Sequence, residues 1–130
     1  MKKLTLLLVF ISIFGYSQTA ITDANIQTAV DLWVSDPSAA TDTYGDISDW
    51  DVSQVTDMLL LFADKTTFND DISAWDVSNV TNMDSMFASA SIFNQDLSDW
   101  CVTNLPTQPT AFDSLASAWT LPRPVWGTCP

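Results

Sequence analysis

Aspartate residues at a fixed spacing are the side chains of this sequence with the clearest chemistry. They recur 25 residues apart in two columns, which consist of Asp46, Asp71 and Asp96, and of Asp51 and Asp76. If the chain coils once per 25 residues, these like charges lie about 5 Å apart, which is unfavourable unless something neutralises them. Backbone N–H groups at turns are one answer, and a bound Ca²⁺ with oxygen ligands is the other. The sequence contains no EF-hand or nonapeptide calcium signature, so both alternatives stay open.

Amide and aromatic residues recur at the same spacing. A repeated Asn typically bonds the backbone of its turn and of the neighbouring repeat, and ligand contact is the alternative. A Trp column is typical of a core, although exposed aromatic faces also bind sugar rings. The recurring residues that we assign to the structure of the repeat are Trp50, Trp75, Trp100, Phe62, Phe87, Phe112, Asn69 and Asn94.

Enzyme chemistry has little support in this composition. The chain contains no His, which excludes catalytic triads and imidazole metal sites. It has three Gly and no glycine-rich phosphate loop. Paired Asp residues could in principle hydrolyse glycosides, but nothing marks one acid as buried beside an ionised partner. We therefore expect no catalytic residues and no cofactor, with Ca²⁺ as the one candidate ion.

The first residues indicate export. Residues 1–17 have a basic start, an apolar run of about 11 residues and small residues before a cleavage point, which predicts a secretory signal peptide. The alternative is a membrane anchor, but the run is shorter than the about 20 residues that a span needs. We expect the mature chain to begin at Gln18, to insert into no membrane and to be extracellular or at the cell surface.

Removal of the signal peptide changes the net charge of the chain, and export favours a disulfide between its cysteines. The mature chain keeps two cationic residues against 16 Asp and no Glu, a net charge of −14. Such a chain repels nucleic acid and anionic lipid, and Asp favours turns. Cys101 and Cys129 predict a disulfide in an exported protein, worth about 3.5 kcal/mol in the chain-entropy model. Two free thiols are the alternative, and two thiols without His make a poor zinc site.

The elements that position these residues form a 25-residue repeat. Residues 46–116 hold three copies, and such a period predicts a solenoid in which stacked units share a core. Within the second copy we expect a short strand at 71–75, a turn at 76–80 and a two-turn helix at 83–88 that carries Met83, Met86 and Phe87 on one face. In the third copy, Gln108 replaces the Met of the earlier copies.

Capping segments are expected at both ends of the repeat. Residues 18–45 contain an amphipathic helix from Asp23 to Val34, stopped at Asp36-Pro37, and a linker from Ser38 to Gly45. Residues 117–130 are expected to lay apolar side chains over the last repeat, and the disulfide would hold them there. These side chains are Trp119, Leu121, Val125 and Trp126.

The stretch from Trp75 to Trp100 reads Trp-Asp-Val-Ser-x-Val-Thr-x-Met-x-x-Met-Phe-x-x-Ala-x-x-Phe-Asn-x-Asp-Leu-Ser-x-Trp. This pattern resembles the BspA-like family of bacterial leucine-rich-repeat surface proteins over residues 46–112. The resemblance implies an exported, surface-associated repeat domain that mediates binding or adhesion, with no catalytic residues. The first copy departs from the pattern, since Leu61 replaces the second Met and Lys65-Thr66-Thr67 replaces the small-residue stretch. No residue-level binding site follows from the match.

Together these observations predict an α/β fold. We expect a short, right-handed, leucine-rich-repeat-like solenoid with an N-terminal helical cap and a disulfide-pinned C-terminal cap. We expect an exported, monomeric binding or adhesion module that presents a rigid acidic repeat face to an extracellular protein or glycan surface. The alternative is a structural envelope or spacer module, stiffened by calcium or not, with no specific ligand.

Overall fold

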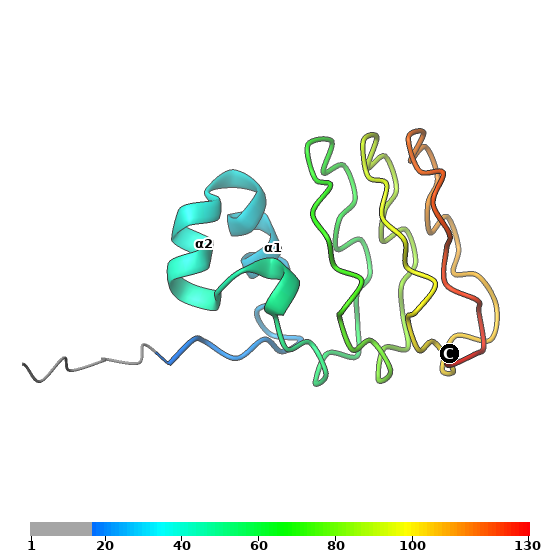
Figure 1. Ribbon diagram of the computed structural model, residues 1–130, viewed down its shortest axis with the longest axis horizontal. Helices are drawn as coiled ribbons and strands as arrows, with labels where there is room; N and C mark the ends of the chain where they lie inside the picture. The colour runs from blue at the N-terminus through cyan, green and yellow to red at the C-terminus, as the bar shows by residue number, and fades with distance from the viewer. Residues whose placement is uncertain (1–16) are drawn as a thin grey trace, which may run out of the picture.

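The computed structural model describes residues 17–130, so the predicted signal peptide lies almost wholly outside the described part. Two α-helices come first, α1 (Ile26–Ser35) and α2 (Pro37–Tyr44), followed by one 3₁₀ turn, η1 (Ile47–Asp49). The rest of the chain runs in turns and coil that rise and fall side by side (Figure 1). The helices lie at one end of this row, and the C-terminus lies at the other.

Local sequence sets the helix boundaries. Helix α1 buries Ile26, Val30 and Trp33 on one face and ends at Ser35, with Asp36 as its C-cap. The same Asp36 is the N-cap of α2, where its carboxylate accepts the N–H of Ala39 at 3.1 Å. Proline at the first helical position, Asp at the N-cap and Gly45 with φ 82° after the last turn are strong helix signals. The predicted linker at 38–45 is therefore mostly helix.

Backbone hydrogen bonds define three stacked laps. We call residues 46–70 lap 1, residues 71–95 lap 2 and residues 96–121 lap 3. The N–H of Phe62 in lap 1 donates to the carbonyl of Met86 in lap 2 at 2.8 Å. The N–H of Phe87 in lap 2 donates in the same way to the carbonyl of Phe112 in lap 3, also at 2.8 Å. Each lap therefore lies directly against the next.

The predicted right-handed, leucine-rich-repeat-like α/β solenoid is wrong. Residues 17–130 contain two short α-helices and no strand or sheet, apart from one isolated bridge between Asp57 and Asn82. The expected strand at 71–75 and the expected helix at 83–88 are turns and coil. The molecule is instead a row of turn-rich laps capped by helices at one end.

The hydrogen-bond pattern explains why neither a helix nor a strand forms. In lap 2 the N–H groups of Met86, Ala88 and Ala90 each donate to the carbonyl three residues earlier, so each closes a single turn. The alternate N–H groups, on Ser85, Phe87 and Ser89, donate to lap 3 instead. Local and inter-lap bonds thus alternate along the chain. In an α-helix all of these N–H groups would donate to carbonyls of the same segment, and in a β-strand they would all donate to a neighbouring strand.

Left-handed residues recur at fixed places in these turns. Non-glycine residues with positive φ occur at two positions of every lap, with φ between 52° and 63°. The first position holds Leu60, Ser85 and Ala111, and the second holds Asp64, Ser89 and Leu115. Such φ values are unfavourable for residues with a Cβ, so the stacked hydrogen bonds must hold them in place.

These positions also show that lap 3 contains one inserted residue. Equivalent residues are 25 apart between laps 1 and 2, but 26 apart between Ser85 and Ala111 and between Ser89 and Leu115. Hydrogen bonds within the turns show the same 26-residue step. The N–H of Met86 donates to the carbonyl of Met83, and the N–H of Phe112 donates to that of Pro109. Pro109, rather than the predicted Gln108, therefore takes the buried place of the earlier Met residues.

The core runs through all laps as columns of apolar side chains. Phe62 stacks on Phe87 with ring centroids 5.3 Å apart, and Phe68 stacks on Phe93 at 5.7 Å. Trp119 completes the second column, 4.8 Å from Phe93. Aromatic pairs at these distances contribute stability beyond the area that they bury. Because of the insertion, Phe112 occupies the place of Met86 rather than that of Phe87.

Different devices cover the two ends of the row. Helix α1 packs against lap 1, where the indole of Trp33 meets that of Trp50 with centroids 6.0 Å apart. At the other end Trp119 is buried and Trp126 packs edge-on to Phe112. Leu121 and Val125 were expected to cover lap 3 as well, but both are exposed. No helix within residues 17–130 is long and apolar enough to span a membrane.

Candidate functional site

The repeated Asp residues form a series of exposed turns. In each turn Oδ1 of the Asp accepts the backbone N–H of the Ser two residues later, at 2.9 Å for Asp46 and 3.0 Å for Asp76. Asp46 and Asp76 are both exposed, and in each turn the hydroxyl of the same Ser also donates to Oδ1. The same bond is made by Asp51, Asp71 and Asp96.

These hydrogen bonds lower the pKa of each carboxyl. In Asp76 the hydroxyl of Ser78 lowers the pKa most, and the backbone N–H of Ser78 lowers it further. The nearby charge of Asp51 raises it, as the smallest of the contributions. The pKa values of Asp46, Asp51, Asp71 and Asp96 are lowered for the same reason. Each carboxylate is therefore ionised and held in one orientation at neutral pH.

The same turns bear on the predicted calcium site. Within residues 17–130 no three side chains of the His, Cys, Asp or Glu type lie close enough together to hold a metal ion. One oxygen of each repeated Asp is already engaged by its own turn. Backbone N–H groups thus provide the partner that each charge needs, and calcium binding stays a prediction.

The repeated Asn residues link one lap to the next. Oδ1 of Asn69 accepts the backbone N–H of Asn94 at 2.7 Å, and Oδ1 of Asn94 accepts the N–H groups of Thr120 and Leu121. Gln95 adds a bond to the carbonyl of Asn69 at 2.7 Å. The amides are therefore committed to the backbone of the neighbouring lap.

The structure shows a second amide ladder that we did not predict. Nδ2 of Asn79 donates to the carbonyl of Ser53 at 2.8 Å, and Nδ2 of Asn104 donates to that of Ser78 at 2.9 Å. Each bond joins a lap to the one before it. The sequence contained the signal, since Asn79 and Asn104 are 25 residues apart.

The Trp column lies in the core. Exposed fractions are 4% for Trp50, 3% for Trp75 and 1% for Trp100, which leaves no open indole face for a sugar. The indole N–H of Trp75 donates to the carbonyl of Ile47, and that of Trp100 donates to the carbonyl of Ile72. Trp75 and Trp100 thus each bond their lap to the preceding lap through the indole N–H, and Trp50 donates to the carbonyl of Gly45 just before lap 1.

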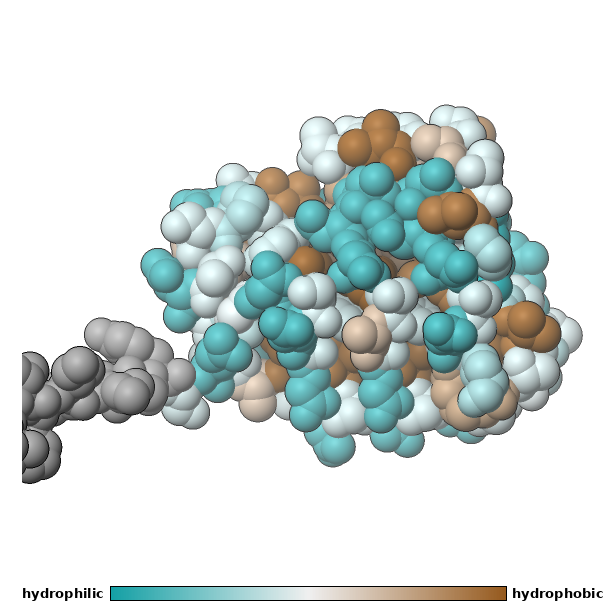
Figure 2. Space-filling model, in the orientation of Figure 1, coloured by the Kyte–Doolittle hydropathy of each residue, from teal (hydrophilic) through white to brown (hydrophobic). Residues whose placement is uncertain are grey.

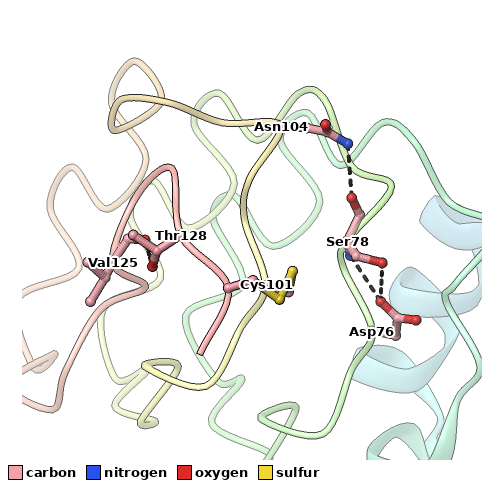
Figure 3. Close-up of a disulfide and its surroundings, with 7 residues drawn as sticks. Asp76, Ser78, Cys101, Asn104, Val125 and Thr128 are labelled. Carbon is pink, nitrogen blue, oxygen red and sulfur yellow. Dashed lines mark hydrogen bonds between the residues drawn. A yellow bond between two sulfur atoms is a disulfide. The ribbon is translucent and has the colours of Figure 1, made fainter.

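The predicted disulfide is confirmed. Cys101 and Cys129 are bonded, with their Cα atoms 4.0 Å apart. The bond holds the C-terminal segment against lap 3, where the N–H of Val102 donates to the carbonyl of Thr128 at 2.8 Å. Figure 3 shows the disulfide beside the Asp76 turn and the bond from Asn104 to Ser78. The final residues are therefore fixed to the repeat next to its acidic turns.

Comparison with known proteins adds a family. Residues 35–126 match a family described as "Mycoplasma protein of unknown function, DUF285". The chain belongs to the DUF285 family. No curated protein and no solved structure matches the sequence.

Membership of the DUF285 family covers the parts that build the surface described above. The match begins at the last residue of α1 and includes α2, all three laps and most of the C-terminal segment. The description of the DUF285 family assigns it no activity, so function must be inferred from the geometry. The resemblance to BspA-like proteins is not part of this match.

A shallow polar cavity lies beside the insertion in lap 3. It measures about 370 Å³, and Asn82, Asp84, Asn104 and Gln108 contribute to its lining. Proline at 106 has no N–H, so it cannot repeat the bond that Thr81 donates to the carbonyl of Thr56. Pro106 and the inserted residue thus interrupt the backbone hydrogen bonds between laps 2 and 3, and the cavity lies at this interruption.

The surface as a whole is acidic and patterned. Figure 2 shows hydrophilic side chains spread over one face of the row, with hydrophobic residues between them. Among residues 17–130 the two cationic side chains are both engaged, Lys65 with Asp31 and Arg123 with Asp113. The repeated Asp turns have no cation within reach in this part of the chain and present their charge outward.

Proposed function

We propose that the protein is an exported binding or adhesion module whose rigid acidic repeat face binds an extracellular protein or glycan surface. The observation that supports this proposal is the row of Asp–Ser turns. Each carboxylate is exposed, ionised and oriented by its own turn, and each recurs on a neighbouring lap. Preorganised groups lose little entropy on binding, which favours a specific ligand.

The chemistry of the face favours ligands with cationic or hydrogen-bond-donating groups. Residues 17–130 have a net charge of −14, from two cationic residues and 16 Asp. Such a field attracts basic protein surfaces and amino or hydroxyl groups of glycans, and it repels nucleic acid and anionic lipid. The resemblance to BspA-like surface proteins supports the same proposal, as does the predicted signal peptide at residues 1–17. No catalytic role is proposed.

The proposal can be tested with a variant that removes charge but keeps the turns. Asparagine retains the oxygen that accepts the Ser N–H, so replacing the five repeated Asp by Asn should preserve the fold. A glycan and protein array probed with the mature chain should give specific binding that the five-site variant loses. Absence of binding above background, or equal binding by the variant, would contradict the proposal. Circular dichroism and the melting temperature serve as folding controls.

The second candidate is a structural envelope or spacer module stiffened by calcium. It is favoured by the nearness of Asp51 and Asp76, whose like charges raise the pKa of Asp76 slightly against the dominant effect of its turn. A cation shared by the two carboxylates would remove that repulsion. Calcium should then raise the melting temperature well above the effect of magnesium at equal concentration. No difference between the two ions would remove this candidate.

A further inference from the structure

The C-terminal end of the row has an open hydrogen-bonding edge. In laps 1 and 2, N–H groups at three alternate positions donate to the next lap, from Leu60, Phe62 and Asp64 and from Ser85, Phe87 and Ser89. With the 26-residue step, the equivalent groups in lap 3 belong to Ala111, Asp113 and Leu115. Within residues 17–130 these three N–H groups have no acceptor.

The side chains at this edge differ from those of the other laps. Leu115 is 76% exposed with φ 63°, whereas the equivalent positions hold the polar residues Asp64 and Ser89. Trp126 packs edge-on to Phe112 on the same lap and is only partly buried. Both carboxylate oxygens of Asp113 are already engaged, by Arg123 and by Gln108. The edge thus offers three N–H donors beside an exposed apolar side chain.

We propose that this edge binds a peptide segment of a partner protein, which docks as one further lap. The occupant must present carbonyl groups at alternate residues, as Thr110, Phe112 and Ser114 do for lap 2. Addition of a segment to an open backbone edge is an established mode of peptide recognition, in which main-chain bonds give affinity and side-chain contacts give specificity. The net charge of −14 favours a neutral or basic segment with an apolar residue that contacts Leu115.

A second copy of the chain fits this edge poorly. Two such edges facing each other would place donors against donors. At the matching carbonyl edge of lap 1, the carbonyl of Leu61 already accepts from Gln27 of α1 at 3.2 Å, so a second copy would have to compete with that helix. The proposed peptide contact uses neither the acidic face nor its five Asp residues. It therefore stands or falls independently of the proposed function.

Amide hydrogen exchange measured by NMR gives the first test. In the free protein the N–H groups of Ala111, Asp113 and Leu115 should exchange fast, and those of Ser85, Phe87 and Ser89 slowly. The probe is a synthetic peptide with the sequence of residues 83–95, blocked ends and the change Asp84→Lys. Its addition should slow exchange at the three lap-3 sites by about tenfold or more, while a scrambled peptide should not.

A matched pair of variants locates the contact. Leu115→Asp removes the exposed apolar side chain that the peptide contacts and restores the residue type of Asp64, so it should weaken peptide binding by about tenfold without unfolding the chain. Leu60→Asp is the control, because Leu60 is also an exposed Leu with positive φ but lies in a paired lap. Equal weakening by both variants would overturn the proposal.

Three further outcomes would also overturn it. One is slow exchange of the lap-3 amides in the free protein. Another is unchanged exchange at saturating peptide. The third is concentration-dependent self-association in sedimentation, since that would make a second copy the occupant of the edge.

Discussion

The two ends of the row of laps are covered by different structures. At the N-terminal end α1 packs against lap 1, and Asp23 before the helix and Gln27 within it bond backbone groups of that lap. Asp23 accepts the N–H groups of Thr56 and Asp57, and Gln27 donates to the carbonyl of Leu61. At the C-terminal end a segment without helix or strand lies against lap 3, held by a disulfide and by Arg123 on Asp113.

The difference shows what a cap must provide. Apolar cover is present at both ends, through Trp33 in α1 and Trp119 in the C-terminal segment. Bonding to the backbone differs between the ends. Asp23 and Gln27 bond two N–H groups and one carbonyl of lap 1, whereas the N–H groups of Ala111, Asp113 and Leu115 have no acceptor within residues 17–130. The disulfide thus lies at the end where, in the part of the chain that the structure describes, no helix packs against the repeat and three backbone donors are open.

The largest effect is expected from the core that joins the two ends. Phe87 contacts Phe62, Phe93, Phe112 and Trp119. Phe87→Ala should lower the free energy of unfolding by about 3–5 kcal/mol, from lost burial and a cavity. Urea unfolding followed by Trp fluorescence measures it, with Phe87→Leu as a milder control. Separate transitions for the two ends in the native protein would show that they do not share one core.

Removal of the disulfide should affect one end selectively. The double variant Cys101→Ser and Cys129→Ser is expected to lose about 3.5 kcal/mol, because the unfolded chain gains loop entropy. Amide hydrogen exchange should accelerate at residues 117–130 through local opening. In α1 exchange should stay slow, because that helix would still open only on global unfolding. Equal acceleration in α1 and in the C-terminal segment would contradict the division into two independent caps.

At the N-terminal end, Asp23→Ala removes three hydrogen bonds, from two backbone N–H groups and the hydroxyl of Thr56. We expect a loss of about 1–2 kcal/mol in unfolding free energy, because two backbone donors of lap 1 then lose their protein acceptor. Asp31→Ala is the control, since it removes a surface pair with Lys65 and should cost less than about 1 kcal/mol. A larger effect of Asp31→Ala would refute the capping role of Asp23.

The smallest effect concerns pH and belongs to the turns between the two ends. The pKa of Asp76 is lowered in the folded state, chiefly by the hydroxyl of Ser78. A lowered pKa stabilises the fold above the usual Asp pKa of about 4, and the benefit disappears as pH falls through the lowered value. The melting temperature of the wild type should exceed that of Asp76→Asn at pH 7, and the difference should shrink as pH falls below the lowered pKa of Asp76. A gap that widens on acidification would contradict this sign.

The sequence predicted the stacking interval and most of the core, because buried apolar side chains must recur where laps share one interior. It did not predict the backbone conformation. Residues 83–88 carry apolar side chains at helical spacing, yet Ser85 has φ 54°, which ends any helix after one turn. Ser and Leu at left-handed positions give no local signal, whereas Gly or Asn would have given one.

Lap 3 shows a second limit of pattern matching. Phe112 lies 25 residues after Phe87, which suggests equivalence, but the 26-residue step pairs Phe112 with Met86 and Trp119 with Phe93. The insertion lies in a stretch that contains Pro106 and Pro109, where turns replace inter-lap hydrogen bonds. In this stretch the pattern of apolar residues does not determine how lap 3 aligns with lap 2. Helix α2 was missed although its Asp36-Pro37 start was visible. The repeated Asp residues were identified, but their Ser partners were not.

Scalar couplings across hydrogen bonds, measured by NMR on uniformly labelled protein, test the stacked laps and their register together. We predict a coupling between the amide nitrogen of Phe62 and the carbonyl carbon of Met86, and another between the nitrogen of Phe87 and the carbonyl carbon of Phe112. A coupling from Phe87 to the carbonyl carbon of Ala111 would contradict the insertion in lap 3. Absence of any coupling between laps, in a folded sample, would contradict the stack itself.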